Sequence, residues 1–254
     1  MLGEASDLQA AQAAARYVLE GMRQEDGRLF ATARDGRAHL DACLEDYVFM
    51  TQGLIDLYET DFDPHWIREA LTLTEIVETR FTDRERGGYF TTGEGHEALI
   101  ARTKNLHDGA LPAATGVQAL NLARLGALTE RQAWLDRAAA VAGEQAKLVN
   151  RHPRLFSQLL CAVDFLRAPH RQVVISGKAG AADTQALLDT VRSAFIPQRV
   201  VALADADADT TLFPLLQGRT PSDTGARAFV CRDFVCDTPA TNEEQLDTQL
   251  RAVG

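Results

Sequence analysis

The chain has 254 residues, 46% of them hydrophobic and 24% charged, a balance typical of one large globular domain or two smaller ones. Its 26 basic and 36 acidic residues give a net charge of -10, which argues against nucleic acid or an anionic membrane as a partner. No apolar run approaches the roughly 18 residues of a membrane span, and four cysteines do not make a disulfide scaffold. We therefore expect a soluble, cytoplasmic protein.

The first two thirds of the chain predict three helical hairpins. The first helix of each hairpin is amphipathic, with apolar and charged residues alternating at the helical period. The second helix is apolar on nearly all sides, which is typical of a helix buried between neighbours. We expect the amphipathic helices at about 7–22, 64–80 and 130–148, and the buried ones at about 42–59, 111–125 and 154–167.

Similar turn segments connect the two helices of each hairpin. Residues 25–30 and 85–90 share the pattern, and residues 151–156 repeat it more faintly. A fixed period of about 60 residues is typical of stacked hairpins. Because an outer amphipathic helix alternates with an inner buried one, the fold class expected for residues 1–168 is a mainly α, α/α-hairpin toroid.

The pattern changes after Pro169. Short β-branched runs predict strands at 172–176 and 199–203, with one or two more between 226 and 235. A helix is expected at 183–194 between the first two strands, and a last helix at about 242–252, begun by a capping box at Thr241 and Glu244. Strands and helices with short glycine-containing connections indicate a small α/β domain over residues 169–254.

Two acidic residues occupy equivalent places in the first two hairpins. Asp46 lies near the start of one buried helix and Asp108 just before the next, so both should lie at one rim of the toroid. Two carboxylates facing a cavity are the minimum for glycoside hydrolysis or other acid–base chemistry on a sugar. The alternative is structural, because acidic residues favour helix N-termini and an aspartate before glycine is common in turns.

Neighbouring residues are weaker candidates for the same chemistry. Glu45 lies about 100° from Asp46 around a helix, so one of the two at most can face the cavity. His107 is a candidate base oriented by Asp108, or simply a polar surface residue. Flat apolar faces and polar contacts for a substrate are expected from Tyr47, Tyr89, Phe90, Arg102 and Lys104. Neither a His-Glu-x-x-His nor a Gly-x-Ser-x-Gly motif occurs, and we predict no metal site and no cofactor.

Cys231 and Cys236 form a C-x4-C pair in a β-rich segment. With a turn at Arg232 and Asp233, the two thiols would approach each other across a hairpin and could take part in thiol redox chemistry. The pair is too small a set for a zinc site, and its spacing differs from the redox C-x-x-C motif. The alternative is a pair of buried structural thiols.

Four ordered segments resemble the spermatogenesis-associated thioredoxin-domain proteins, a family with many bacterial members. They are residues 44–49, 87–94, 102–112 and 229–236. The resemblance implies an (α/α)6 toroid, similar to six-hairpin glycosidases and N-acylglucosamine 2-epimerases, after a thioredoxin-like domain. The chain resembles the C-terminal part alone. We therefore expect three hairpins, half of such a barrel, without the thioredoxin-like domain or the first half of the toroid.

The resemblance also assigns individual positions. Asp46 and Asp108 match the acidic positions at the rim, and Cys231 and Cys236 match the terminal cysteine pair. At residues 113–115 this chain has Ala-Ala-Thr, where the family usually has Ser, Gly and Asn. The change removes two hydrogen-bonding side chains beside the expected cavity, which weakens the prediction of catalysis.

Three functions are compatible with these observations. The first is a non-catalytic binding or scaffold module, favoured because half a toroid cannot close a pocket by itself. The second is a carbohydrate-processing enzyme, a glycoside hydrolase or sugar epimerase that uses the paired carboxylates. The third is thiol redox chemistry at the cysteine pair. The expected partners are a small sugar-like ligand and a second copy of the chain, bound through uncovered faces of the inner helices.

Overall fold

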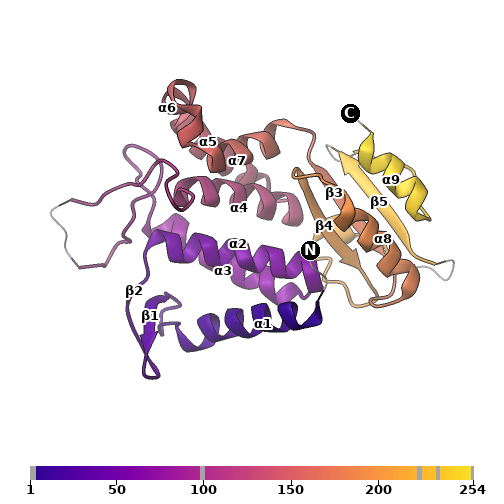
Figure 1. Ribbon diagram of the computed structural model, residues 1–254, viewed down its shortest axis with the longest axis horizontal. Coiled ribbons are helices and arrows are strands. Elements are labelled where there is room, and N and C mark those ends of the chain that lie inside the picture. Colours follow the sequence, from indigo (N-terminus) through magenta and orange to yellow (C-terminus); the bar gives the residue numbers. More distant parts are fainter. Residues whose placement is uncertain (1–3, 98–100, 222–224, 233–234, 253–254) are drawn as a thin grey trace. The chain divides into compact units, whose positions relative to one another are not determined.

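The computed structural model describes residues 4–97, 101–221, 225–232 and 235–252 (Figure 1). The chain divides into two compact units. Of the described residues, those of 4–123 and 136–163 form the helical unit, and those of 124–135 and 164–252 form the sheet unit. The coarse prediction of a mainly α chain with a small α/β part agrees with the structure, whereas the toroid and the domain boundary at residue 169 stay predictions.

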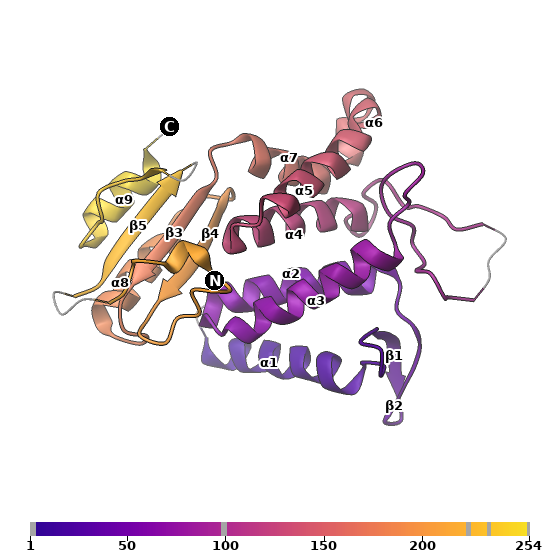
Figure 2. The same cartoon turned by 180° about the vertical axis from the view of Figure 1, so that it is seen from behind.

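Helices α1, α2 and α3 lie side by side in the helical unit (Figures 1 and 2). Helix α2 is buried through Leu54, Ile55 and Tyr58, and α3 is buried through Trp66, whose side chain is fully enclosed. The helical elements that lie wholly or partly in this unit are α1 (Ala5–Arg16) with a π-helical turn (Tyr17–Gly21), α2 (Leu44–Asp61), α3 (Pro64–Arg80), α4 (Ala114–Thr129), α5 (Gln132–Glu144), α6 (Ala146–Arg151), a 3-10 turn (Pro153–Leu155) and α7 (Ser157–Arg167).

A β-hairpin that the sequence interpretation leaves out precedes α2. Its strands are β1 (Phe30–Arg34) and β2 (Arg37–Asp41), which pair antiparallel. The connection is Asp35-Gly36, and both residues have positive φ, 52° and 74°. Two such residues are what a tight type I′ turn requires, so the local chemistry explains the hairpin.

The third hairpin departs from its predicted bounds. The helix expected at 130–148 is divided into α5 and α6, with the conformationally costly Gly143 just before the division. The helix expected from residue 154 begins at Ser157, because Pro153–Leu155 forms a 3-10 turn instead.

Helix α4 packs closely on the start of α7 at a glycine. A Cβ atom at Gly116 would lie 2.8 Å from the backbone nitrogen of Leu159, whereas a Cβ atom at Gly53 in α2 would meet nothing within 4 Å. Gly116→Ala should therefore lower the free energy of unfolding by about 1–3 kcal/mol through overpacking. Gly53→Ala is the matched control and should raise it by about 0.5–1 kcal/mol, since alanine favours the helix. Urea titrations of both variants measure the two changes in unfolding free energy. Changes of the same sign in the two variants would contradict this packing.

The sheet unit contains one sheet with strand order β4-β3-β5-β6. Strand β3 pairs parallel with β4 and antiparallel with β5, and β5 pairs antiparallel with β6. Its elements are β3 (Arg171–Ser176), α8 (Ala182–Ser193), β4 (Arg199–Ala204), a 3-10 turn (Pro214–Leu216), β5 (Arg227–Arg232), β6 (Val235–Cys236) and α9 (Glu243–Arg251).

Helices α8 and α9 lie together on one face of the sheet (Figures 1 and 2). The last helix is capped one residue later than the sequence predicts. The side chain of Asn242, not that of Thr241, accepts from the backbone of Gln245 at 3.0 Å, while Gln245 Oε1 accepts from the Thr241 backbone at 2.9 Å. Asn242 is thus the N-cap residue, and Gln245 binds the backbone one residue before it.

Candidate functional site

Asp46, the first predicted acid, belongs to the start of α2. Its Oδ2 accepts a hydrogen bond from the backbone N–H of Cys43 at 2.8 Å, which is the reciprocal bond of a helix capping box. Glu45 precedes it in the first helical turn and is half-buried. This capping contact is the one that the structural alternative predicts, and a catalytic role for Asp46 stays a prediction.

Asp108, the second predicted acid, joins two helix starts. Its Oδ1 accepts from the backbone N–H of Ala113 at 2.8 Å, just before α4, and its Oδ2 accepts from Gln158 at 2.9 Å, in the first turn of α7. Both carboxylate oxygens are therefore engaged by backbone donors. The neighbouring His107 is exposed.

Tyr47 is part of the core. Its side chain is 1% exposed, its hydroxyl accepts from the Leu29 backbone at 2.8 Å, and its ring centroid lies 5.3 Å from that of Phe81. The predicted substrate contact is therefore enclosed by protein groups. Burial raises the pKa of the Tyr47 hydroxyl above its ordinary value.

Three of the weaker candidates do converge. The guanidinium carbon of Arg102 lies 4.1 Å from the ring centroid of Phe90, and the ammonium of Lys104 lies 5.1 Å from the same ring. Arg102 also donates to the backbone carbonyl of Thr92 at 3.0 Å. Two cations close to one aromatic ring stabilise the loop before α4 through cation–π contacts.

Tyr89, the remaining aromatic candidate, belongs to a cluster of polar side chains around Glu78. Its hydroxyl donates to Glu78 Oε1, which also accepts from Gln118 Nε2 at 3.1 Å, while Glu78 Oε2 accepts from Arg137 Nε at 2.8 Å. The Arg137 guanidinium also lies 5.1 Å from the Tyr89 ring centroid. Burial first, and then the charge of Glu78, raise the Tyr89 pKa well above its usual value.

Sequence reasoning missed Glu78, Gln118 and Arg137. One signal was present, because Gln118 is a polar residue in the mostly apolar helix α4 and is fully buried. A buried amide requires a hydrogen-bonding partner, but this requirement alone does not identify which residue the partner is.

Lys104 forms a second ion pair in the same unit. Its ammonium lies 2.7 Å from Asp83 Oδ2 and also donates to the carbonyl of Gly87. Asp83 Oδ1 accepts from the backbones of Glu85 and Arg86, each at 3.0 Å. The Lys104 hydrogen bond, followed by these backbone bonds, holds the pKa of Asp83 at about 2, below its ordinary 3.8.

This ion pair predicts an acid-sensitive contribution to stability. Because the folded state lowers the Asp83 pKa, the contribution is complete above the unfolded value and is lost as the pH falls toward about 2. Asp83→Asn should flatten the dependence of unfolding free energy on pH between about 4 and 2. Urea titrations at stepped pH measure it, with the exposed Asp35→Asn as the control that should leave the slope unchanged. An unchanged slope in Asp83→Asn would contradict the assignment.

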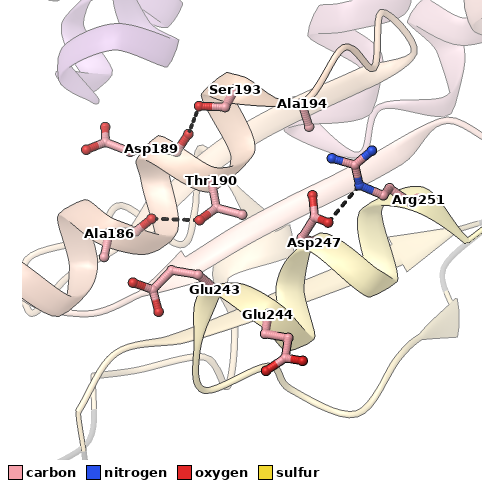
Figure 3. Close-up of a pocket in the computed structure, with 9 residues that line it drawn as sticks. All are labelled: Ala186, Asp189, Thr190, Ser193, Ala194, Glu243, Glu244, Asp247 and Arg251. Atoms are coloured by element: carbon pink, nitrogen blue, oxygen red, sulfur yellow. Dashed lines mark hydrogen bonds and ion pairs between the residues drawn. The ribbon is translucent and has the colours of Figure 1, made fainter.

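An acidic groove lies between α8 and α9 (Figure 3). Its volume is about 590 Å³, within the range of small-molecule and peptide sites. Asp247 pairs with Arg251 at 2.7 Å across one helical turn. The lining consists of Ala186, Asp189, Thr190, Ser193, Ala194, Glu243, Glu244, Asp247 and Arg251. The sequence interpretation assigned none of these residues to a site, because a groove between helices leaves no motif.

Cys231 and Cys236 are joined in a disulfide between β5 and β6. The sequence predicts a turn at Arg232 and Asp233, and Asp233 lies outside the described residues. The structural alternative of two buried thiols does not hold, because Cys236 is exposed. Cys43 and Cys161 are free thiols.

Neither a metal-binding cluster nor a membrane-spanning helix occurs within the described part of the chain. No three histidine, cysteine, aspartate or glutamate side chains there are grouped so that they could hold a metal ion. Within the same residues, no helix is both long and apolar enough to cross a membrane.

Comparisons with known proteins support the resemblance inferred from the sequence. No family model matches the chain. The human protein named spermatogenesis-associated protein 20 is 34% identical over 207 residues, which is 80% of this chain and 26% of the human protein. The rat protein of that name gives the same identity and coverage, and the mouse protein is 32% identical. Over the quarter of their length that it spans, the chain is a homologue of these proteins called spermatogenesis-associated protein 20.

Proposed function

We propose that this chain is a non-catalytic binding region that holds a basic segment of a partner protein in the groove between α8 and α9. The observation that carries the proposal is the groove itself, which combines concave shape with four carboxylates, Asp189, Glu243, Glu244 and Asp247. Arg251 is the one cation in the lining and is paired with Asp247. The rim therefore has a net negative charge.

Charge complementarity identifies the occupant. Among the described residues, Glu243 and Glu244 have no side-chain ion pair or hydrogen bond, so both carboxylates are available to lysine or arginine side chains. Ala186 and Ala194 provide small apolar contacts in the same lining, which suit an alanine or leucine of the segment. Phe195 follows Ala194 and is 95% exposed, so a bound segment has a large apolar side chain to cover.

A binding measurement with paired variants tests the groove. A labelled peptide of lysine, alanine and leucine should bind in fluorescence anisotropy, and the same peptide with glutamate for lysine should not. Neutralising the rim in Glu243→Gln/Glu244→Gln should weaken binding at least about fivefold and reduce its dependence on salt. Asp205→Asn/Asp207→Asn, equal in charge change and outside the groove, should leave it unaltered. Equal affinities for all three proteins would refute the proposal.

The carbohydrate-processing alternative is less well supported. Both carboxylate oxygens of Asp108 and one of Asp46 accept hydrogen bonds from backbone N–H groups, which favours structural roles for the two side chains. Incubation with oligosaccharides and N-acylated amino sugars, analysed for hydrolysis and for epimers, should show no turnover. Turnover abolished by Asp108→Asn would overturn the non-catalytic assignment and restore a sugar-like ligand as the partner.

The larger architecture is inferred from the resemblance. The hairpins of the helical unit are compatible with part of an α/α toroid like that of six-hairpin glycosidases. Self-association through inner helices has limited support, because the exposed large apolar side chains of the described residues include none on α2 or α4. Sedimentation analysis at increasing concentration tests the predicted homodimer, and a constant monomer mass would refute it.

A further inference from the structure

We propose that the Cys231–Cys236 disulfide is a thiol–disulfide exchange site that accepts electrons from a dithiol, with Arg219 as its positioning residue. The two cysteines are direct cross-strand partners, with Cα atoms 3.9 Å apart. Cys231 is 1% exposed, whereas Cys236 is exposed at the end of the sheet. A reductant in solution therefore reaches one sulfur of the pair.

Arg219 is held against both sulfurs. Its Nη2 lies 3.2 Å from Cys231 Sγ and 3.1 Å from Cys236 Sγ. The guanidinium is fixed by a hydrogen bond from Nη1 to the Leu215 carbonyl and by the Phe229 ring, 5.4 Å from its carbon. Neutral disulfide sulfurs are weak acceptors, whereas a thiolate next to a guanidinium is strongly stabilised. The fixed cation thus favours the reduced state.

The other charged groups near the pair act on different partners. Arg227 lies over the Phe229 ring at 6.0 Å, and no sulfur contact is recorded for it among the described residues. Arg232 is paired with Asp237 at 2.8 Å and also donates to the carbonyl of Gln249. Burial lowers the pKa of the Arg219 guanidinium, and the charge of Glu130 opposes part of this shift. Arg219 is therefore the cation that faces the sulfurs.

The exchange reaction follows from exposure and charge. A thiolate of the dithiol attacks Cys236 Sγ, the bond between the protein sulfurs breaks, and its electron pair leaves on Cys231 as a thiolate beside Arg219. The second thiol of the reductant loses its proton and attacks its own mixed-disulfide sulfur, which releases the Cys236 thiolate. The protein gains two electrons and becomes a dithiol, while the reductant becomes a cyclic or protein disulfide.

The first experiment determines which of the two cysteine sulfurs a thiolate attacks. The oxidised full chain is treated briefly with glutathione, quenched with acid and digested with trypsin. Cleavage after Arg232 places the two cysteines in different peptides, so their masses are read separately. We expect glutathione on the Cys236 peptide. Glutathione on the Cys231 peptide, or no reaction in the folded protein, would overturn the proposal.

The second experiment tests the role of the Arg219 guanidinium. The fraction reduced is determined in mixtures of oxidised and reduced dithiothreitol, together with the pH at which thiolate absorbance appears. Arg219→Gln should shift the equilibrium about tenfold toward the disulfide and raise that pH, and Arg219→Lys should restore part of both. Arg227→Gln, which removes a cation from the same aromatic ring, should change neither. If Arg219→Gln and Arg219→Lys both match the wild type, Arg219 has no such role.

Discussion

Glu78→Ala should lower the free energy of unfolding by about 3–5 kcal/mol, the range found when one partner of a buried ion pair is removed. The Glu78 and Arg137 side chains are 17% and 23% exposed, so the guanidinium left behind is largely shielded from water. Gln118 and the Tyr89 hydroxyl lose their acceptor at the same time. Urea unfolding followed by circular dichroism measures the change.

A second variant on the same helix separates this effect from helix propensity. Glu75 lies on α3 and is exposed, so Glu75→Ala should change the free energy of unfolding by less than about 0.5 kcal/mol. The double variant Glu78→Ala/Arg137→Met should recover part of the loss, because it also removes the guanidinium that Glu78→Ala leaves with Glu144, 3.5 Å away, as its remaining ion-pair partner among the described residues. If Glu78→Ala and Glu75→Ala have equal effects, Glu78 does not organise the cluster.

Asp108→Ala should cost about 2–3 kcal/mol, because two backbone donors at the starts of α4 and α7 lose their acceptor. Asp108→Asn should cost less, since its amide oxygen still accepts one of the two bonds. The exposed neighbour provides the control, and His107→Ala should stay within about 0.5 kcal/mol of the parent chain. Thermal and urea unfolding give all three values. A neutral Asp108→Ala would show that the carboxylate is not structural.

Periodicity was sufficient to predict most helices and strands, because each depends on local pattern. The helices near α2 and α3 and the strands β3 and β4 follow directly from apolar spacing. The β1–β2 hairpin lies outside the predicted helical repeat, although Asp35-Gly36 is a strong turn signal. The division between α5 and α6 has weaker local cues.

The site was less predictable, because its contacts join distant parts of the chain. Tyr89, Phe90, Arg102 and Lys104 were identified as polar or aromatic candidates, yet their partners are set by tertiary packing. Glu78 and Arg137 are 59 residues apart, and no local pattern connects them. Arg219 is likewise separated from Cys231 by 12 residues and a strand.

Nuclear magnetic resonance mapping of the basic peptide on nitrogen-15-labelled protein tests the binding function most directly. We predict amide shift changes concentrated in α8, α9 and the residues around Phe195, saturating with added peptide and absent with the glutamate-substituted peptide. Saccharides should leave the amides of Asp46, Asp108 and their neighbours unshifted. No response to the basic peptide, or saccharide-dependent shifts around Asp46 and Asp108, would contradict a non-catalytic binding region that acts through the α8–α9 groove.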